Sequence, residues 1–257
     1  MLSPVSRTAV GVARVRAAES RRPDALFRDP FAEKFVAAAG VPPRTEPPGP
    51  GVRALAAQVI VRTRFYDACL SASTSRQVVL LAAGLDARAY RLDWPPGTRV
   101  FEADLEPVLE FKQRVLDASG AQPRCERVPV PVDLRRDDWP EVLRAAGFDP
   151  GQPTAWLVEG LLVYLSREEA AGVLSRLTGA SAPGSTLALE RSAHGRIPPV
   201  EGVTTLWQGG LGAGTADWLR EHGWDVTLTN LGEAAQRYGR PFAKPTESAF
   251  VTAVRTG

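Results

Sequence analysis

Residues 78–106 constrain the fold more than any other part of the chain. An apolar run at 78–82 is followed by a turn at Gly84, and a second apolar run leads to the acidic residues at 102–106. The first run has no polar alternation, which is typical of a strand buried on both faces of a parallel sheet. The order of strand, glycine turn, helix and strand therefore predicts an α/β fold with a ligand site at the carboxyl ends of its strands.

The rest of the chain alternates between strand and helix patterns. We expect strands near 77–83, 98–103, 126–132, 154–159, 185–190, 224–229 and 248–255, and helices near 86–92, 105–117, 138–146, 167–179 and 215–222. This alternation predicts a doubly wound, mostly parallel sheet.

The N-terminal region has a different pattern. A Pro/Gly cluster at 41–51 separates two helical stretches, and residues 52–70 carry apolar side chains at helical spacing. We therefore expect an N-terminal helical cap over residues 1–75, followed by the main domain over 76–257. Within that domain the loop-rich segment at about 192–214 is expected to be a lid-like insert.

The composition excludes several classes of protein. The 257 residues carry 31 basic and 29 acidic side chains, a net charge of +2, and the basic residues are scattered. We expect no nucleic-acid partner. Because no apolar run approaches the roughly 20 residues of a membrane span, we also expect a soluble, cytoplasmic protein without a membrane partner. Cys69 and Cys125 have no Cys or His at ligand spacing, so we expect no metal site.

Acidic residues follow the predicted strands. Asp104 comes 20 residues after Gly84, a spacing at which an acid binds ribose hydroxyls in dinucleotide-binding folds. An ordinary turn glycine and a satisfied loop carboxylate remain the alternative. Asp133, which a helix N-cap would also explain, and Glu159, which interrupts an apolar run, follow the third and fourth strands. The single glycine of AAGLDARAY weakens a nicotinamide-dependent oxidoreductase hypothesis, because that fingerprint needs three glycines.

Four segments together resemble the motifs of the leucine carboxyl methyltransferase-like family. They are VARVRAAESRRPDALFRDPFAEKFV, VVLLAAGLDARAYRLDWPPGTRVFEADLEPVLEFK, VDLRRDDW and WLVEGLLVYL. The resemblance covers about residues 5–191 and extends weakly over 223–241. It implies a class I, Rossmann-like methyltransferase fold, in the bacterial small-molecule O-methyltransferase branch of the family, with S-adenosyl-L-methionine as cofactor.

The resemblance also implies which positions bind the cofactor. Arg62 matches the arginine that pairs with the cofactor carboxylate, and Arg64 is the neighbouring candidate. The other implied cofactor-binding residues are Gly84 beneath the cofactor, Asp104 at the ribose, Asp133 and Leu134 at the adenine, and Glu159 near the methionyl amino group. The family usually has Gly-Ala-Gly where this chain has Ala82-Ala83-Gly84, so we expect reduced cofactor affinity.

The leading hypothesis is methyl transfer to a carboxylate of a small molecule, in secondary metabolism. A carboxylate is ionised at neutral pH and needs no general base, which fits a chain with only two histidines, His194 and His222. A phenol or alcohol acceptor would need a base, and His194 is the candidate. Tyr164 is the candidate lining of the acceptor pocket and Trp207 its cover, although packing is the commoner role of such aromatic residues.

Two arginines and two further functions stay undecided at this point. Arg88 and Arg91 are either structural or bind an acidic acceptor. A nucleotide-binding oxidoreductase and a non-catalytic cofactor-binding module are hypotheses of a different class. The acceptor's identity and the oligomeric state do not follow from the sequence.

Overall fold

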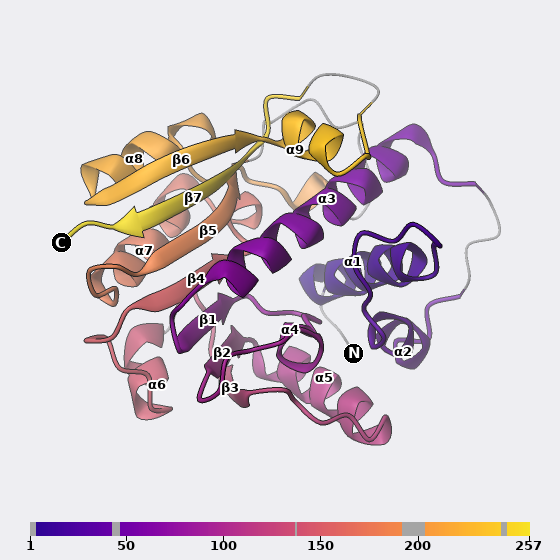
Figure 1. The fold of residues 1–257 in the computed structure, drawn as a ribbon, viewed down its shortest axis with the longest axis horizontal. Helices are drawn as coiled ribbons and strands as arrows, with labels where there is room; N and C mark the ends of the chain where they lie inside the picture. Colours follow the sequence, from indigo (N-terminus) through magenta and orange to yellow (C-terminus); the bar gives the residue numbers. More distant parts are fainter. Residues whose placement is uncertain (1–3, 43–46, 137, 192–203, 243–245) are drawn as a thin grey trace.

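The core of the protein is a mixed β-sheet (Figure 1). The computed structural model describes residues 4–42, 47–136, 138–191, 204–242 and 246–257. The strands in this part are β1 (Gln77–Leu81), β2 (Arg99–Asp104), β3 (Glu126–Pro131), β4 (Thr154–Val158), β5 (Thr186–Arg191), β6 (Trp224–Asn230) and β7 (Ala249–Arg255). Their order is β3-β2-β1-β4-β5-β7-β6. The first five are parallel, whereas β7 runs antiparallel to both β5 and β6. The doubly wound, mostly parallel sheet is therefore confirmed.

Helices cover both faces of this sheet. They are α1 (Pro4–Ser20), α2 (Ala32–Ala38), α3 (Pro50–Ala72), α4 (Arg88–Arg91), α5 (Glu106–Ala118), α6 (Trp139–Ala145), α7 (Arg167–Gly179), α8 (Thr215–Glu221) and α9 (Leu231–Arg237). Three 3-10 turns are also described, η1 (Leu162–Tyr164), η2 (Thr204–Leu206) and η3 (Gly212–Gly214).

The predicted strands and helices are confirmed to within a few residues, but α9 was not predicted. Its start had a readable signal, because the Asn230 side chain accepts hydrogen bonds from the backbone N–H groups of Gly232 and Glu233 at 2.7 and 3.3 Å. Asparagine is a preferred N-cap residue. The helix has only seven residues, which is too short for a clear apolar periodicity in the sequence.

Two apolar layers hold the helices to the sheet. One layer joins α6, α7 and α8 to the side chains on one face of the strands. The other joins α3, α4, α5 and α9, together with α1 and α2, to the opposite face. β1 is buried at every position, as its unbroken apolar sequence requires. The protein is thus a three-layer α/β/α structure.

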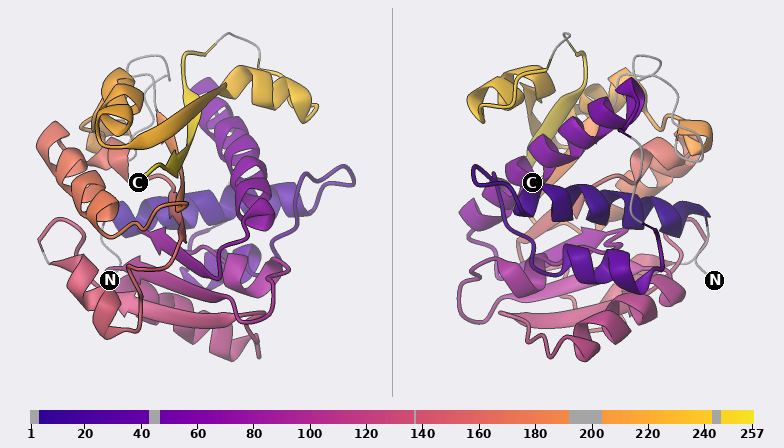
Figure 2. Two further views of the ribbon diagram at one scale, coloured as in Figure 1. Left: turned by 60° about the vertical axis from the view of Figure 1, so that its left-hand side comes forward. Right: turned by 90° about the vertical axis from the view of Figure 1, so that its right-hand side faces the viewer.

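The N-terminal helices lie beside the carboxyl ends of the parallel strands (Figures 1 and 2). The long helix α3 crosses the sheet, and its Phe65 ring stacks on Phe250 of β7 with centroids 4.1 Å apart. The expected helices are therefore present, while the domain boundary at residue 75 stays a prediction. Of the predicted lid-like insert, residues 192–203 lie outside the described residues and the remainder contains η2 and η3.

Candidate active site

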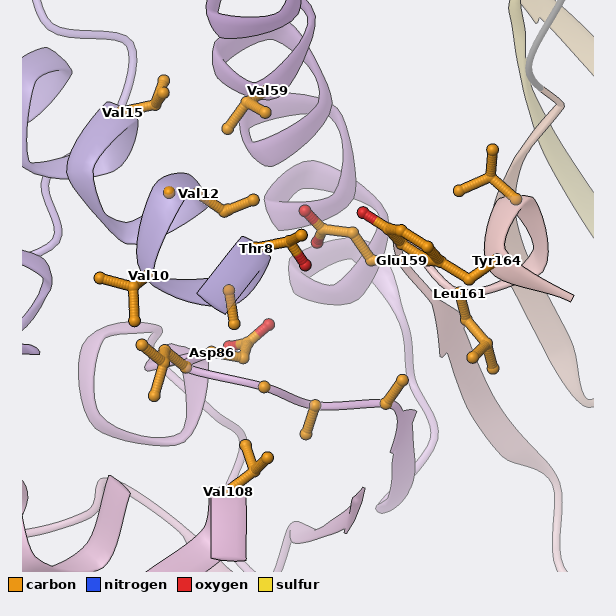
Figure 3. A pocket seen from close by; sticks show the side chains of 18 of the residues that line it. Thr8, Val10, Val12, Val15, Val59, Asp86, Val108, Glu159, Leu161 and Tyr164 are labelled. Carbon is orange, nitrogen blue, oxygen red and sulfur yellow. The ribbon is translucent and has the colours of Figure 1, made fainter. Parts of the chain in front are cut away.

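A cavity of about 1700 Å³ lies at the carboxyl ends of the parallel strands, against α1 and α3 (Figure 3). One chemistry-bearing residue follows or ends each of the first five strands and lines it: Gly84 after β1, Asp104 on β2, Asp133 after β3, Glu159 after β4 and Glu190 on β5. The structure therefore brings together all four of the sequence-predicted strand-end residues. Leu134, Arg62 and Tyr164 line the same cavity.

The turn after β1 is fixed against the end of β2. The Gly84 N–H donates to Asp104 Oδ2 at 2.6 Å, and the Leu105 N–H donates to Asp104 Oδ1 at 2.7 Å. Gly84 has φ +49°, a left-handed conformation that glycine adopts without steric cost. Burial raises the pKa of Asp104, although the two N–H donors oppose this. The Asp104 carboxylate is thus held in one orientation at the cavity wall.

Ala82, at the start of the same turn, also has a left-handed backbone, with φ +55°. A Cβ atom makes this conformation costly by about 1–2 kcal/mol. The comparison of Ala82-Ala83-Gly84 with Gly-Ala-Gly predicted only the added methyl group, and the strained backbone of Ala82 is seen in the structure.

Asp133 and Leu134 form the end of the cavity beyond β3. Asp133 Oδ1 accepts a hydrogen bond from the Arg135 N–H at 3.0 Å, and the guanidinium of Arg135 lies 3.5 Å from the same oxygen. Leu134 is buried. A carboxylate beside an apolar side chain provides a hydrogen-bond acceptor next to a surface on which a flat ring can pack.

Arg62 of α3 lines the cavity and joins the ends of β4 and β5. Its Nε donates to Glu159 Oε1 at 2.9 Å and its Nη1 donates to Glu190 Oε1 at 3.2 Å. Among the described residues no hydrogen bond is found from its Nη2. Arg64, the alternative candidate, lies instead over the Tyr238 ring, 5.3 Å from the centroid, and does not line the cavity.

A second arginine forms ion pairs with three carboxylates, one of which is Glu159 of this site. Arg88 on α4 is fully buried and pairs with Asp67 of α3 at 2.7 Å, with Asp86, and with Glu159 at 2.8 Å. Arg91 binds the same Asp67 with two hydrogen bonds of 2.6 Å. Of the two roles left open for Arg88 and Arg91, this geometry fits the structural one.

The carboxylates around these arginines differ in their acidity. Burial pushes the pKa of Asp86 upward, but the charges of Arg88, Lys112, Arg16 and Arg91 together outweigh it and hold this pKa at about 2. Burial likewise opposes ionisation of Glu159, and Arg88 and Arg62 nevertheless lower its pKa. The pKa of Glu190 is raised, because burial and the neighbouring Glu159 together outweigh Arg62. Glu190 is therefore the carboxyl group of this cluster that binds a proton most readily.

Glu190 was missed in the sequence, although it is as firmly held as the predicted residues. Besides Arg62, it accepts hydrogen bonds from the Tyr66 hydroxyl at 2.8 Å and the Gly160 N–H at 2.6 Å. Arg62 and Tyr66 are four residues apart and so share one face of α3. The available signal was an acid at the end of the fifth strand, in TLALER.

The remaining candidate residues have different positions. Tyr164 lies in η1 and extends toward Glu159 in Figure 3, and Trp207 also lines the cavity. His194 lies outside the described residues. His222 stacks on Trp218 at a centroid distance of 3.7 Å and does not line the cavity.

The described residues include neither a cluster suited to a metal ion nor a helix suited to a membrane span. Within the described ranges, no group of three or more His, Cys, Asp or Glu residues is arranged to hold a metal ion. In the same part of the chain no helix has both the length and the apolar character needed to cross a bilayer.

Comparison with known sequences identifies the family. The sequence pattern of the leucine carboxyl methyltransferase family matches residues 9–178. A protein of Parafrankia sp. (strain EAN1pec) is 48% identical, over 98% of this chain and 87% of its own length. One from Frankia alni is 46% identical over 98% of this chain and 94% of its own length. Both are named "Putative S-adenosyl-L-methionine-dependent methyltransferase".

The chain belongs to the leucine carboxyl methyltransferase family. It is an S-adenosyl-L-methionine-dependent methyltransferase.

Solved structures with the same fold support the class I assignment of this methyltransferase. A protein of the duf574 family from Streptomyces avermitilis superposes with a TM-score of 0.62 at 16% identity, covering 95% of this chain and 96% of the other. The magnesium protoporphyrin IX methyltransferase of Synechocystis PCC 6803, solved with bound S-adenosylmethionine, gives a TM-score of 0.52 at 13% identity, covering 96% and 97%. These structures show a shared fold, whereas the assignment as a methyltransferase rests on the family match and the closely similar sequences.

The cavity of this methyltransferase has the chemistry that the cofactor requires. The cofactor carries a ribose diol, an adenine, an amino group, a carboxylate and a sulfonium cation. The turn at Gly84 brings backbone to the cavity wall, and Asp104 presents an oriented carboxylate. Arg62 uses Nε and Nη1 in its pairs with Glu159 and Glu190, so its Nη2 is the nitrogen that can donate to the cofactor carboxylate. The residues present therefore fit the cofactor.

Proposed function

We propose that this methyltransferase transfers a methyl group to a carboxylate oxygen of a small molecule. The observation that carries the proposal is that no His, Cys or Lys is among the described residues that line the cavity. A carboxylate acceptor has an ordinary pKa near about 4 and is already ionised at neutral pH. It requires positioning behind the methyl group rather than deprotonation.

The proposed roles of the cavity residues follow from their positions. Asp104 accepts hydrogen bonds from the ribose hydroxyls, and the Gly84 turn allows backbone to approach the cofactor closely. Arg62 Nη2 binds the methionyl carboxylate, while Glu159 faces the amino group. Asp133 and Leu134 bracket the adenine, with the Asp133 carboxylate accepting from its amino group. When bound, the cofactor supplies an electrophilic methyl group on a sulfonium.

The protein's own contribution is to orient the reactants and exclude water. Arg62 is held by two carboxylates and does not need to reorganise when the cofactor carboxylate arrives. Tyr164 and Trp207 line the acceptor side of the cavity in this proposal. Placing an ionised oxygen in line with the methyl group converts a bimolecular reaction into an effectively unimolecular one.

A hydroxyl acceptor is the second candidate, and one residue favours it. Glu190 lines the cavity and has a raised pKa, which makes it a better base than the neighbouring Glu159. The pH dependence of the methyl-transfer rate separates the two. A carboxylate acceptor predicts a flat rate from about pH 6 to about pH 9, whereas a phenol or alcohol predicts a steep rise over this range.

The first experiment tests the cofactor site. Asp104→Ala should weaken S-adenosylmethionine binding by about 5- to 150-fold, because about 1–3 kcal/mol of hydrogen bonding is lost. Calorimetric titration measures the affinity, and Asp93→Ala is the matched control because Asp93 is 96% exposed. Equal affinities in the two variants would remove Asp104 from the cofactor site.

The second experiment tests the reaction. Methyl-labelled S-adenosylmethionine is incubated with the protein and an extract of small molecules, and the labelled products are identified by mass spectrometry. A methyl ester, which alkali cleaves to release labelled methanol, supports the proposal. An alkali-stable methyl ether would support the hydroxyl acceptor, and tight cofactor binding without any labelled product would favour a non-catalytic module.

A further inference from the structure

The outer part of the cavity has aliphatic walls. We define this outer chamber by Val12 and Val15 of α1, Leu55 and Val59 of α3, Leu161, and Leu206 of η2. Figure 3 shows Val12 and Val59 pointing into the same space from two different helices, with Leu161 beside Tyr164. All of these side chains except Val59 are half-buried. Their remaining exposure is therefore directed at least partly into the cavity.

The cavity has room for a second ligand beside the cofactor. Ligand pockets commonly have volumes of about 300–1,000 Å³. The volume here is about 1700 Å³. Apart from Arg62 on α3, the cofactor-binding positions proposed above lie at the strand ends, so the outer chamber on α1 and α3 is left for the acceptor.

Some of the charged residues that line the cavity pair with one another at the strand ends. Arg62 pairs with both Glu159 and Glu190 at the carboxyl ends of β4 and β5. Arg14, which also lines the cavity from α1, donates to the backbone carbonyls of Val41 and Pro42 at 3.4 and 2.6 Å. The acceptor side therefore combines one charged end with an aliphatic chamber.

We propose that the acceptor is a carboxylic acid with an aliphatic body, which packs in the outer chamber and presents its carboxylate toward the strand ends, where the proposed cofactor-binding residues lie. This inference rests on the proposed function and specifies its substrate class. An acid without a large apolar body would leave the aliphatic walls exposed to water. Each methylene group transferred from water to such walls strengthens binding by about fourfold, which corresponds to about 0.8 kcal/mol.

The test uses a series of linear acids. Hexanoate, octanoate and decanoate are titrated into the protein saturated with S-adenosylhomocysteine, and the dissociation constant is measured by calorimetry. We expect it to fall by about two- to fourfold per added methylene. Octanedioate and decanedioate are the length-matched controls and should bind at least about tenfold more weakly, because a second carboxylate would be buried against aliphatic walls.

Two substitutions then place the acid in the chamber. Val12→Thr and Leu55→Gln together should weaken decanoate binding by about tenfold and leave S-adenosylmethionine binding within about twofold. The control is Val254→Thr on β7, since Val254 is 46% exposed and does not line the cavity. Its decanoate affinity should equal that of the unaltered protein.

The outcomes separate this inference from the proposed function. Loss of the chain-length dependence, or equal binding of the dicarboxylates, would overturn the aliphatic acceptor while S-adenosylmethionine still binds. Unchanged decanoate affinity in the doubly substituted protein would also overturn it. Failure to bind S-adenosylmethionine would instead refute the proposed function.

Discussion

Two buried groups of charges in this protein have similar chemistry and different surroundings. The cavity-side cluster consists of Arg62, Arg88, Arg91, Asp67, Asp86, Glu159 and Glu190. The interior cluster consists of Glu102, Lys112 and Arg127, in which Lys112 Nζ and Arg127 Nη2 lie 2.7 and 2.8 Å from Glu102 Oε2. In the first cluster, the side chains of Arg62, Glu159 and Glu190 are 12–18% exposed. Glu102 and Lys112 of the second have none, and none of its residues lines the cavity.

Exposure and charge balance indicate which of these buried charges are available to a ligand. In the cavity-side cluster three arginines face four carboxylates, so one carboxylate is in excess. A cationic ligand would balance it, and the cofactor carries a net positive charge. In the interior cluster two cations share one carboxylate away from the cavity. We therefore expect the first cluster to affect both binding and stability, and the second to affect stability alone.

The largest effect is expected from Arg88→Leu. The substitution removes the strongest partner of Asp86 and one cationic partner each of Asp67 and Glu159. The free energy of unfolding should therefore fall by about 4 kcal/mol. The loss should depend on pH. In the unaltered protein the pKa of Asp86 is depressed from 3.8 to about 2, so its contribution is present above about pH 4 and disappears as the pH falls through about 2.

Urea unfolding of Arg88→Leu at a series of pH values measures how the loss of unfolding free energy depends on pH. The difference in unfolding free energy between variant and unaltered protein should shrink between about pH 4 and about pH 2. A pH-independent difference would mean that Arg88 does not lower the pKa of Asp86.

Lys112→Met should destabilise the protein by about 3 kcal/mol, because Glu102 keeps only Arg127 as a partner in the interior. Cofactor affinity, measured by calorimetry at a temperature where the variant is folded, should stay within about twofold. This variant tests the separation of the two clusters directly. A tenfold loss of affinity without a change in folded fraction would break the distinction.

Glu190→Gln should have the opposite pattern. Glutamine keeps an oxygen for the Gly160 N–H but removes the negative charge beside Arg62, so cofactor affinity should fall by about tenfold. Stability at neutral pH should not fall. The raised pKa of Glu190 means that its ionised form opposes folding, and this opposition is relieved in the unaltered protein as the pH falls through the raised pKa.

Calorimetry and thermal unfolding of Glu190→Gln are compared with those of Glu126→Gln. Glu126 pairs with Arg99 on an exposed surface, so the control removes the same group from a site that does not line the cavity. If both variants bind the cofactor equally well, Glu190 has only a structural role.

The smallest effect concerns the backbone at the cavity side. Ala82→Gly should raise the free energy of unfolding by about 0.5–1 kcal/mol, because it relieves the left-handed conformation at φ +55°. Cofactor affinity should stay the same or improve, since the methyl group at the cavity wall is removed. Destabilisation in urea would show that Ala82 packing outweighs its backbone strain.

Some features of the site followed from the sequence because they are local. Gly84 and Asp104 lie at the ends of two consecutive apolar strands, and parallel strands bring their carboxyl ends to the same edge. Asp133 and Glu159 obey the same rule on β3 and β4. The choice between Arg62 and Arg64 did not, because both lie on α3 and only the packing of that helix decides which side chain enters the cavity.

Local patterns in the sequence predicted the strands, their mostly parallel arrangement and the edge at which the acidic residues gather, because apolar runs and turn residues act over short separations. Only the tertiary structure decided that Arg62 joins Glu159 to Glu190, which are 97 and 128 residues away along the chain. The folded structure also shows that Arg88 is a buried partner of three carboxylates. Ion pairs between distant segments depend on how helices pack across the sheet, and no local pattern of residues records that packing.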